Sequence, residues 1–300
     1  MVFDNQDEKL NWKADLRSAL LDSLVNKHDA NSKIGYYYMC CAPRFLYKYY
    51  NDAPEKLETV KAGKMWYSAP TKFNDVFDCD LTLDDKGIFN SAINMIPNMR
   101  GVIPGSQMWY QIKKLTDKGI RDMNCKITEL REAIGISCLS ESFDSLLMWA
   151  HYANNHHGMC VEYELLSINK QLGFSPVPVV YSQNRIRIDS ISPDSEQKDA
   201  KKSFFMCLTS KSPEWLYEQE WRIIRDQTAC GNKWSSEKRG ALLDMIKPRS
   251  IILGCMASVE LERKAREYCE ECSINLYKME KSPTSYQLIK TPILEFNAEE

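Results

Sequence analysis

Short strand-like segments that do not alternate regularly with helices are the feature that most constrains the fold of this chain. Apolar, β-branched and aromatic residues alternate or cluster at 36–50, 64–70, 134–140, 158–165, 176–182, 220–224, 250–254, 274–279 and 286–291. Helical spacing and end signals predict helices at 7–27, 52–63, 143–153, 194–208, 236–246 and 258–271. Because no glycine-rich turn joins a strand to a helix, a doubly wound nucleotide-binding sheet is not expected. We predict an α+β fold with a mixed, largely antiparallel sheet core and flanking helices.

The same pattern predicts how the chain is organised. Residues 1–33 form an N-terminal amphipathic helix packed on the core, since apolar residues recur there at helical spacing. Residues 34–300 form one α+β domain. Its more polar stretch at about 86–133 is predicted to be a helical insertion, broken by Pro97, Gly101, Pro104 and Gly105.

Composition narrows the class of protein. The chain has 300 residues, 39 Lys and Arg against 41 Asp and Glu, and a net charge of -2, which weakens recognition of nucleic acid through a broad basic surface. No run of about 18 apolar residues is present, so we expect no membrane partner. The start lacks the pattern of a secretory signal, which predicts a cytoplasmic location. Eleven scattered cysteines fit reduced thiols.

Metal binding is not predicted. Cys269 and Cys272 share one face of a helix, with Cys255 upstream, but a second closely spaced pair is missing. His156 and His157 are adjacent, so their side chains point in different directions on a regular backbone. The signatures of P-loop, serine-hydrolase and zinc-protease enzymes are absent from the sequence.

The segment SPEWLYEQEWRII is the most informative for function. Glu218, Glu220 and Arg222 share one strand face. An ion pair between Glu220 and Arg222 on this face would be enough to explain both residues without any catalytic role. The alternative is catalytic: a Glu-x-Glu step at the mouth of a strand suits an enzyme that grips a ribose and stabilises an oxocarbenium-like centre. Glu220 would then supply the charge and Glu218 would orient the acceptor.

Aromatic and polar residues on the first two strands fit the same hypothesis. Tyr47, Lys48 and Tyr49, followed by Ser68, offer ring faces and polar groups for a flat nicotinamide and its ribose. Packing within a sheet would equally explain each aromatic residue. The pocket is predicted to include Trp149, His151 and Tyr152, with Arg222 beside the glutamates. Asn74 and Asp75 are explained by a turn or by a place at the rim.

Several of these segments together resemble a known family. LYKYY, GKMWYSAPTKFNDVFD, SCLSES, LLMWAHYANNHHGMCVEYEL, WLYEQEWRII and SIILG occur in the order typical of the bacterial family catalogued as domain of unknown function 2971. The resemblance covers roughly residues 44 to 280. The chain departs from the family at Val76, where proline is usual, and at Asp78, where glutamate is common.

This family is in turn similar to ADP-ribosyltransferases, which have a His, Arg or Tyr on the first strand, a Ser or Tyr on the second and a final glutamate. The resemblance implies that Tyr47, Ser68 and Glu220 take these positions, with Lys48 and Tyr49 as alternatives to Tyr47. It implies an ADP-ribosyltransferase-like fold and NAD as a substrate that supplies the ADP-ribosyl group. The acceptor, protein or nucleic acid, is not identified.

Three functions follow as hypotheses. The leading one is an NAD-dependent ADP-ribosyltransferase-like effector of the anti-phage or toxin type. The second is a non-catalytic ligand-binding or sensing module of the same fold. A weaker third is a nuclease or other hydrolase that uses Glu162, Glu164 and His151 with a divalent metal.

Overall fold

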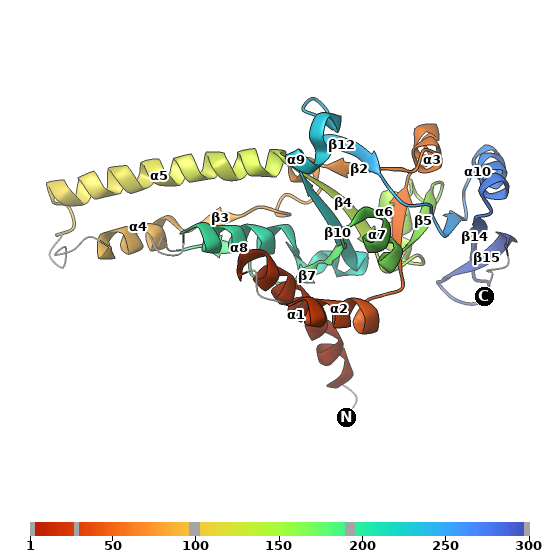
Figure 1. Cartoon of the computed structure of the whole chain (residues 1–300), viewed down its shortest axis with the longest axis horizontal. Coiled ribbons are helices and arrows are strands. Elements are labelled where there is room, and N and C mark those ends of the chain that lie inside the picture. Colours follow the sequence, from red (N-terminus) through yellow and green to blue (C-terminus); the bar gives the residue numbers. More distant parts are fainter. Residues whose placement is uncertain (1–3, 27–29, 96–102, 190–195, 297–300) are drawn as a thin grey trace. The chain divides into compact units, whose positions relative to one another are not determined.

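The structure is a computed structural model that describes residues 4–26, 30–95, 103–189 and 196–296. The chain divides into two compact units, each built from three separate segments (Figure 1). We call Gly35–Ser68, Gly135–Val179 and Glu214–Glu300 the sheet unit, and Met1–Ile34, Ala69–Ile134 and Val180–Pro213 the helical unit. The sequence suggests one domain with an insertion. The contacts group Ala69–Ile134 with the N-terminal segment up to Ile34 and with Val180–Pro213.

One large mixed sheet forms the sheet unit. Its main path runs β11-β12-β2-β4-β1-β5-β13-β14-β15, and β10 pairs with β4 and β6. β13 and β14 are parallel, whereas β5, β12 and β15 pair antiparallel with their neighbours, so the predicted α+β class with a mostly antiparallel sheet is confirmed. The strands are β1 Phe45–Tyr50, β2 Lys64–Ser68, β4 Ile134–Ser140, β5 Met159–Glu164, β6 Val177–Pro178, β10 Glu220–Asp226, β11 Trp234–Ser235, β12 Gly240–Asp244, β13 Ser250–Leu253, β14 Asn275–Lys281 and β15 Leu288–Leu294.

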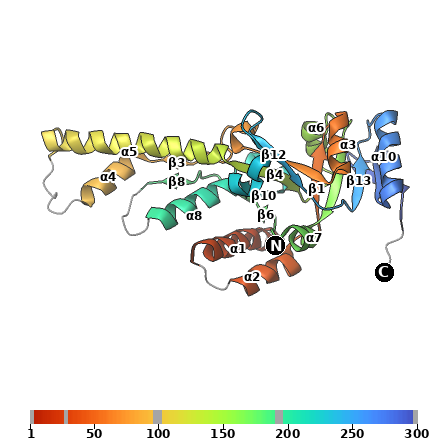
Figure 2. The same cartoon turned by 45° about the horizontal axis from the view of Figure 1, so that its top comes forward.

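Short helices flank this sheet. They are a π-helical turn Tyr37–Cys41, α3 Pro54–Lys61, α6 Leu146–Tyr152, α7 Leu165–Leu172, α9 Gln227–Cys230 and α10 Val259–Cys272, with 3₁₀ turns at Pro213–Glu218 and Gly231–Lys233. The boundary between the two units falls within α2 Asn31–Tyr36. Pro54 begins α3, and Gly63 follows its end with a φ of 61°, as the sequence predicts. Ser258 caps α10 by accepting a hydrogen bond from Leu261 N. α10 packs beside α3, which Figure 2 shows.

The core under α6 fixes the geometry of the sheet. Trp149 is fully buried, and its ring meets the Tyr49 ring edge-on at 5.3 Å between centroids. Its indole Nε1 donates to Phe143 O over 2.8 Å, so the polar edge of this buried ring is satisfied. Cys160, Ile252 and Met279 complete the same cluster. α6 is therefore held firmly against β1, β5 and β13.

The helical unit has little sheet of its own. It contains α1 Asp4–Asn26, α4 Asp85–Asn94, α5 Gln107–Glu132 and α8 Glu196–Leu208, with a 3₁₀ turn at Pro70–Lys72 and two parallel two-stranded ladders, β3 Thr82–Leu83 with β8 Arg187–Ile188 and β7 Val180–Tyr181 with β9 Ser210–Lys211. α1 contacts α8, and α4 contacts α5. Leu81, Ile127 and Cys207 form a small core.

One local prediction is wrong. Residues 240–244 form a strand and not part of a helix at 236–246, because this segment pairs with β2 from Gly240 opposite Ser68 to Asp244 opposite Lys64. Gly240 is needed there, since a Cβ would lie 2.4 Å from the Trp66 ring. The alternation at the end of 36–50 is a strand as predicted, β1, and it follows a π-helical turn that ends at Cys41.

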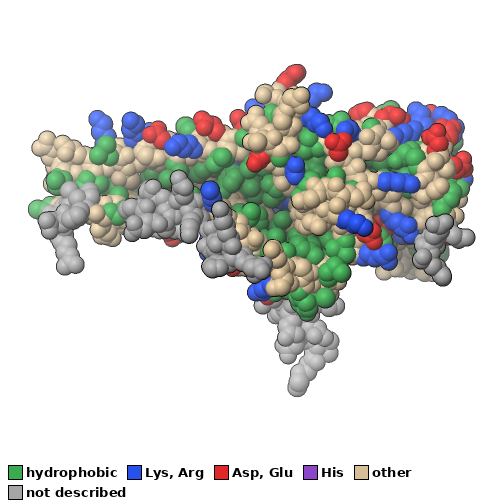
Figure 3. All heavy atoms as spheres, viewed as in Figure 1, with side chains coloured by type: hydrophobic (Ala, Val, Ile, Leu, Met, Phe, Trp, Pro, Cys, Tyr) green, Lys and Arg blue, Asp and Glu red, His purple; other side chains and the backbone are tan. Residues whose placement is uncertain are grey.

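The surface matches the balanced composition. Lys and Arg are interspersed with Asp and Glu over the face in Figure 3. None of the described helices combines the length and apolar character that crossing a membrane requires.

Candidate functional site

A left-handed residue lies between the two glutamates of the Glu-x-Glu step. The 3₁₀ turn ends at Glu218, β10 begins at Glu220, and Gln219 between them has a φ of 43°. Gln219 N donates to Leu216 O over 3.1 Å, and Gln219 O accepts from Glu141 N over 3.1 Å. Such a conformation is unfavourable for glutamine, so these contacts hold the backbone in a strained turn. Both glutamate side chains are thereby buried.

Glu220 forms a two-point ion pair with Arg222. Arg222 Nε donates to Glu220 Oε1 over 2.8 Å, and Arg222 Nη2 donates to Glu220 Oε2 over 3.0 Å. The relative exposure of the two residues is 0% for Arg222 and 3% for Glu220. The ion pair expected from their spacing on one strand face is therefore present, in the fork geometry that gives guanidinium–carboxylate pairs their strength.

Lys48 and Cys138 lie in the electrostatic field of this pair. Lys48 Nζ donates to Cys138 O over 2.8 Å. Burial lowers the pKa of the Lys48 amine, while the charges of Cys138 and Glu220 oppose that shift. Burial also raises the pKa of the Cys138 thiol, and Glu220 adds to this through its charge and a hydrogen bond from the thiol. Of the three first-strand candidates, Lys48 is the one whose pKa is shifted by the charge of Glu220.

Tyr47 takes part in a different polar contact. Its hydroxyl donates to Glu162 Oε1 over 3.2 Å, and Ser250 Oγ donates to Glu162 Oε2. Side chains alternate along a strand, so Tyr47 and Tyr49 lie on the face of β1 opposite Lys48. Burial raises the pKa of the Tyr47 hydroxyl, with a further contribution from Glu162. The structure thus brings Tyr47 to Glu162.

Glu218 lies among aromatic side chains. The Tyr152 hydroxyl donates to Glu218 Oε1 over 2.5 Å. The Tyr217 ring lies 6.0 Å from the His151 imidazole, which is itself 6.3 Å from the Tyr152 ring. His151 is exposed, and Tyr152 and Tyr217 are half-buried. The structure therefore brings together Glu218, Tyr152 and His151.

The remaining predicted residues have separate places. Ser68 ends β2, where it is half-buried and pairs with Ile136 on β4 and Gly240 on β12. Trp149 lies on α6 and is a fully buried core residue. Asn74 and Asp75 belong to the helical unit. Glu164 accepts from Ser167 Oγ over 2.6 Å and pairs with Arg44 at 3.4 Å.

Three residues beside Glu218 and Glu220 were not among the predicted site residues. Ser140 Oγ donates to Glu218 O over 2.6 Å, and Glu141 Oε1 accepts from Trp221 Nε1 over 2.6 Å. Cys138 contacts Glu220. All three belong to the SCLSES segment. The family pattern contains both this segment and WLYEQEWRII, and that shared occurrence is the sequence signal that could have indicated these residues.

The loop that contains His156 and His157 has an unusual backbone conformation. Asn154, Asn155 and His156 have successive positive φ angles of 46°, 51° and 70°. The His156 ring stacks on Trp149, with 6.4 Å between centroids and 11° between planes. Burial lowers the pKa of the His156 imidazole, and Lys281 and His157 lower it further. In the described part of the chain, no three His, Cys, Asp or Glu side chains are grouped to hold a metal ion.

The fold and the site define an α+β protein whose β10 begins with two buried glutamates, one in a fork with arginine and one within an aromatic cluster. Residues 148–223, from α6 into β10, match the family described as "Protein of unknown function (DUF2971)". The resemblance predicted from the ordered motifs is confirmed over these residues. No curated protein and no solved structure gave a match.

Proposed function

We propose that the chain is an ADP-ribosyltransferase-like protein that uses NAD, and that Glu218 acts on the substrate. One observation favours Glu218 over Glu220 as the residue that acts on the substrate. Glu220 has both oxygens in the fork with Arg222, whereas Glu218 lies beside Tyr152 and near the exposed His151. A ligand that reaches the His151 and Tyr217 rings is therefore next to Glu218.

The chemistry would proceed as follows. The bond between nicotinamide and ribose breaks, the electron pair leaves with nicotinamide, and positive charge develops on the ribose. A nearby carboxylate stabilises that charge, as in glycoside hydrolysis. Water or an acceptor group then attacks the ribose carbon and loses its proton. In this proposal Glu218 stabilises the charge, Tyr152 fixes the Glu218 rotamer, and the Tyr217 and His151 rings contact the nicotinamide.

Glu220 has a positioning role in this proposal. The fork with Arg222 and the turn at Gln219 fix the first residues of β10. Glu218 directly precedes this turn, so the turn and the fork fix its backbone. The hydrogen bond from Tyr152 fixes its carboxylate. This reverses the roles expected from the sequence alone, where Glu220 supplies the charge.

Release of nicotinamide from NAD tests the proposal. With mixed protein and nucleic-acid acceptors present, the wild type should release nicotinamide. Glu218→Gln should lower the rate by about 100-fold or more, the scale seen when one transition-state contact is removed. Glu237→Gln, which changes an exposed glutamate before β12, is the matched control and should leave the rate unchanged.

Other results would contradict it. If wild type and Glu218→Gln release nicotinamide equally, Glu218 has no role. If Glu220→Gln is folded and inactive while Glu218→Gln is active, Glu220 supplies the charge. The effector role of the anti-phage or toxin type is tested by expressing wild type and Glu218→Gln in bacteria, where only the wild type should slow growth.

A second candidate is a non-catalytic ligand-binding module. The burial of both glutamates favours it, because carboxylates that are only 4% and 3% exposed offer little surface to a substrate. A ligand that binds the native state raises the thermal midpoint even when it is not turned over. A higher midpoint with NAD and no nicotinamide release would therefore favour the module over the enzyme.

A further inference from the structure

A second polar site lies within the helical unit. It is a cavity of about 240 Å³, and its lining includes Phe77, Gln183, Asn184, Arg185, Ser210 and Lys211. The residues come from the loop before β3, from the segment between β7 and β8, and from β9. Aromatic, amide, hydroxyl and cationic groups therefore surround one small volume.

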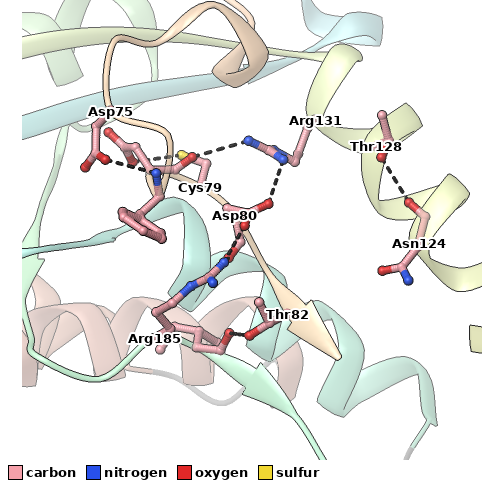
Figure 4. A network of polar contacts seen from close by, with 11 residues as sticks. Asp75, Cys79, Asp80, Thr82, Asn124, Thr128, Arg131 and Arg185 are labelled. Carbon is pink, nitrogen blue, oxygen red and sulfur yellow. Dashed lines mark hydrogen bonds and ion pairs between the residues drawn. The ribbon is translucent and has the colours of Figure 1, made fainter. Parts of the chain in front are cut away.

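The carboxylates beside this cavity are already neutralised. Asp80 accepts from Arg131 Nη1 over 2.9 Å and from Arg185 Nη2, as Figure 4 shows. Asp78 lies 3.6 Å from Lys211 Nζ, and both side chains are buried. Cys79 between the two aspartates has a φ of 54°, so the loop turns sharply to present them to these cations. In these pairs three cations face two carboxylates, so this wall carries a net positive charge.

Arg17 lies next to that wall, because it bonds to Ser210, which lines the cavity. Its Nη1 donates to Ser210 Oγ over 2.7 Å and to Thr209 O over 3.3 Å. Among the described residues, no carboxylate lies within ion-pair distance of Arg17. Burial lowers the pKa of its guanidinium, which means that the charged form has lost part of its hydration. A half-buried guanidinium without a carboxylate partner favours an anion nearby.

Another part of the lining suits a flat ring. Phe77 is 59% exposed, and the Arg185 guanidinium lies 5.2 Å from the centre of its ring. A planar ligand can stack on such a pair. The amides of Gln183 and Asn184 offer both donors and acceptors for the edge of that ring. This end of the cavity therefore offers the contacts that a heterocycle needs.

The volume limits the size of the ligand. Pockets for drug-sized ligands measure about 300 to 1,000 Å³. At about 240 Å³ this cavity is smaller, so it suits a mononucleotide better than a dinucleotide. We propose that it binds a nucleoside monophosphate, with the base against Phe77 and Arg185 and the phosphate toward Arg17 and Ser210. The site is independent of the NAD site proposed at Glu218.

Calorimetry on the full chain tests the proposal, with AMP, adenosine and inorganic phosphate as probes. AMP should bind the wild type at least 10-fold more tightly than adenosine, and inorganic phosphate should compete with AMP. Phe77→Ala and Arg17→Gln should each weaken AMP at least 10-fold. Arg17→Lys keeps the charge and should retain more of the affinity than Arg17→Gln does.

Matched controls lie on α5. Tyr110→Ala and Arg121→Gln change an exposed tyrosine and an exposed arginine outside the cavity lining, and should leave AMP binding unchanged. Because Phe77 is exposed, Phe77→Ala should fold, which circular dichroism verifies. The proposal is overturned if AMP at millimolar concentration gives neither heat nor a thermal shift. It is also overturned if adenosine binds as tightly as AMP, or if Phe77→Ala and Arg17→Gln bind AMP like the wild type.

Discussion

Arg222 holds both carboxylate oxygens of Glu220, which lies two residues earlier on the same strand, over 2.8 and 3.0 Å. Neither side chain has appreciable contact with solvent. Removing water from two charges is costly, and the fork recovers that cost only while both partners are present. The pair therefore acts as a unit, and breaking one half should have a much larger effect than replacing both.

The pair predicts a large loss of stability on single substitution. Arg222→Met should lower the free energy of unfolding by about 3 to 5 kcal/mol, since Glu220 is left charged and buried. Adding Glu220→Leu should recover much of this loss. Urea unfolding measures both effects. Lys61→Met, which removes an exposed pair with Glu58, is the control and should cost roughly 0.2 to 1 kcal/mol. Equal losses for Arg222→Met and Lys61→Met would contradict the prediction.

The turn at Gln219 predicts an unusual pattern of tolerance. Glycine adopts a φ of 43° without strain, so Gln219→Gly should leave the unfolding free energy within about 1 kcal/mol of the wild type. Gln219→Ile places a β-branched residue in the left-handed region and should cost about 2 kcal/mol. Thermal unfolding compares the two variants. A more stable Gln219→Ile than Gln219→Gly would show that this turn is not left-handed in solution.

Buried tyrosines predict loss of stability at alkaline pH. Burial raises the pKa above the ordinary 10.0 for Tyr38, Tyr47, Tyr49, Tyr50, Tyr67 and Tyr163. These groups stay neutral in the folded chain but ionise in the unfolded chain above pH 10. Their contribution is therefore fully present below pH 10 and falls above it, by about 1.4 kcal/mol per pH unit for each tyrosine.

Urea unfolding at pH 8 and at intervals up to pH 11 measures this dependence. The contribution of these tyrosines to the free energy of unfolding should be constant up to about pH 9.5 and should then fall steeply. Ultraviolet titration supplies the control, because the buried tyrosines should ionise together with unfolding. A gradual ionisation of all tyrosines in the folded protein would argue against their burial.

Close backbone packing at Gly254 predicts a sharp contrast between two glycines. A Cβ at Gly254 would lie 2.0 Å from His156 O, whereas a Cβ at Gly119 on α5 would meet no atom within 4 Å. Gly254→Ala should therefore cost about 3 kcal/mol or more. Gly119→Ala should stabilise the protein by about 0.5 to 1 kcal/mol, since alanine favours a helix interior. Thermal midpoints that move in the same direction would contradict this contrast.

Local patterns were enough to predict most of the sheet. Period-two alternation locates β1, β2, β4, β5 and β10, and end signals such as Pro54 and Gly63 locate α3. The segment at 240–244 was misjudged because an apolar run such as ALLDM fits either a helix or a buried strand. Its state is decided by pairing with β2, which lies far away in the sequence.

The candidate site was predictable only in part. Alternation along β10 places Glu220 and Arg222 on one face, so their pairing follows from spacing. The contact of Tyr47 with Glu162 joins residues 115 positions apart, and no local rule indicates it. The division of the chain into two units is equally non-local, because each unit draws on three separate segments.

The partners of β1 also bear on synthesis. β1 pairs with β5 over its whole length, and β5 begins only at Met159. While the ribosome translates the intervening residues, the backbone groups of Phe45–Tyr50 have no partner from β5, and this aromatic strand is exposed to other chains. Pairing across so long a stretch of sequence also makes folding slow. We therefore expect the nascent chain to depend on chaperones until β5 has emerged, and lower expression temperature to improve the yield of folded protein.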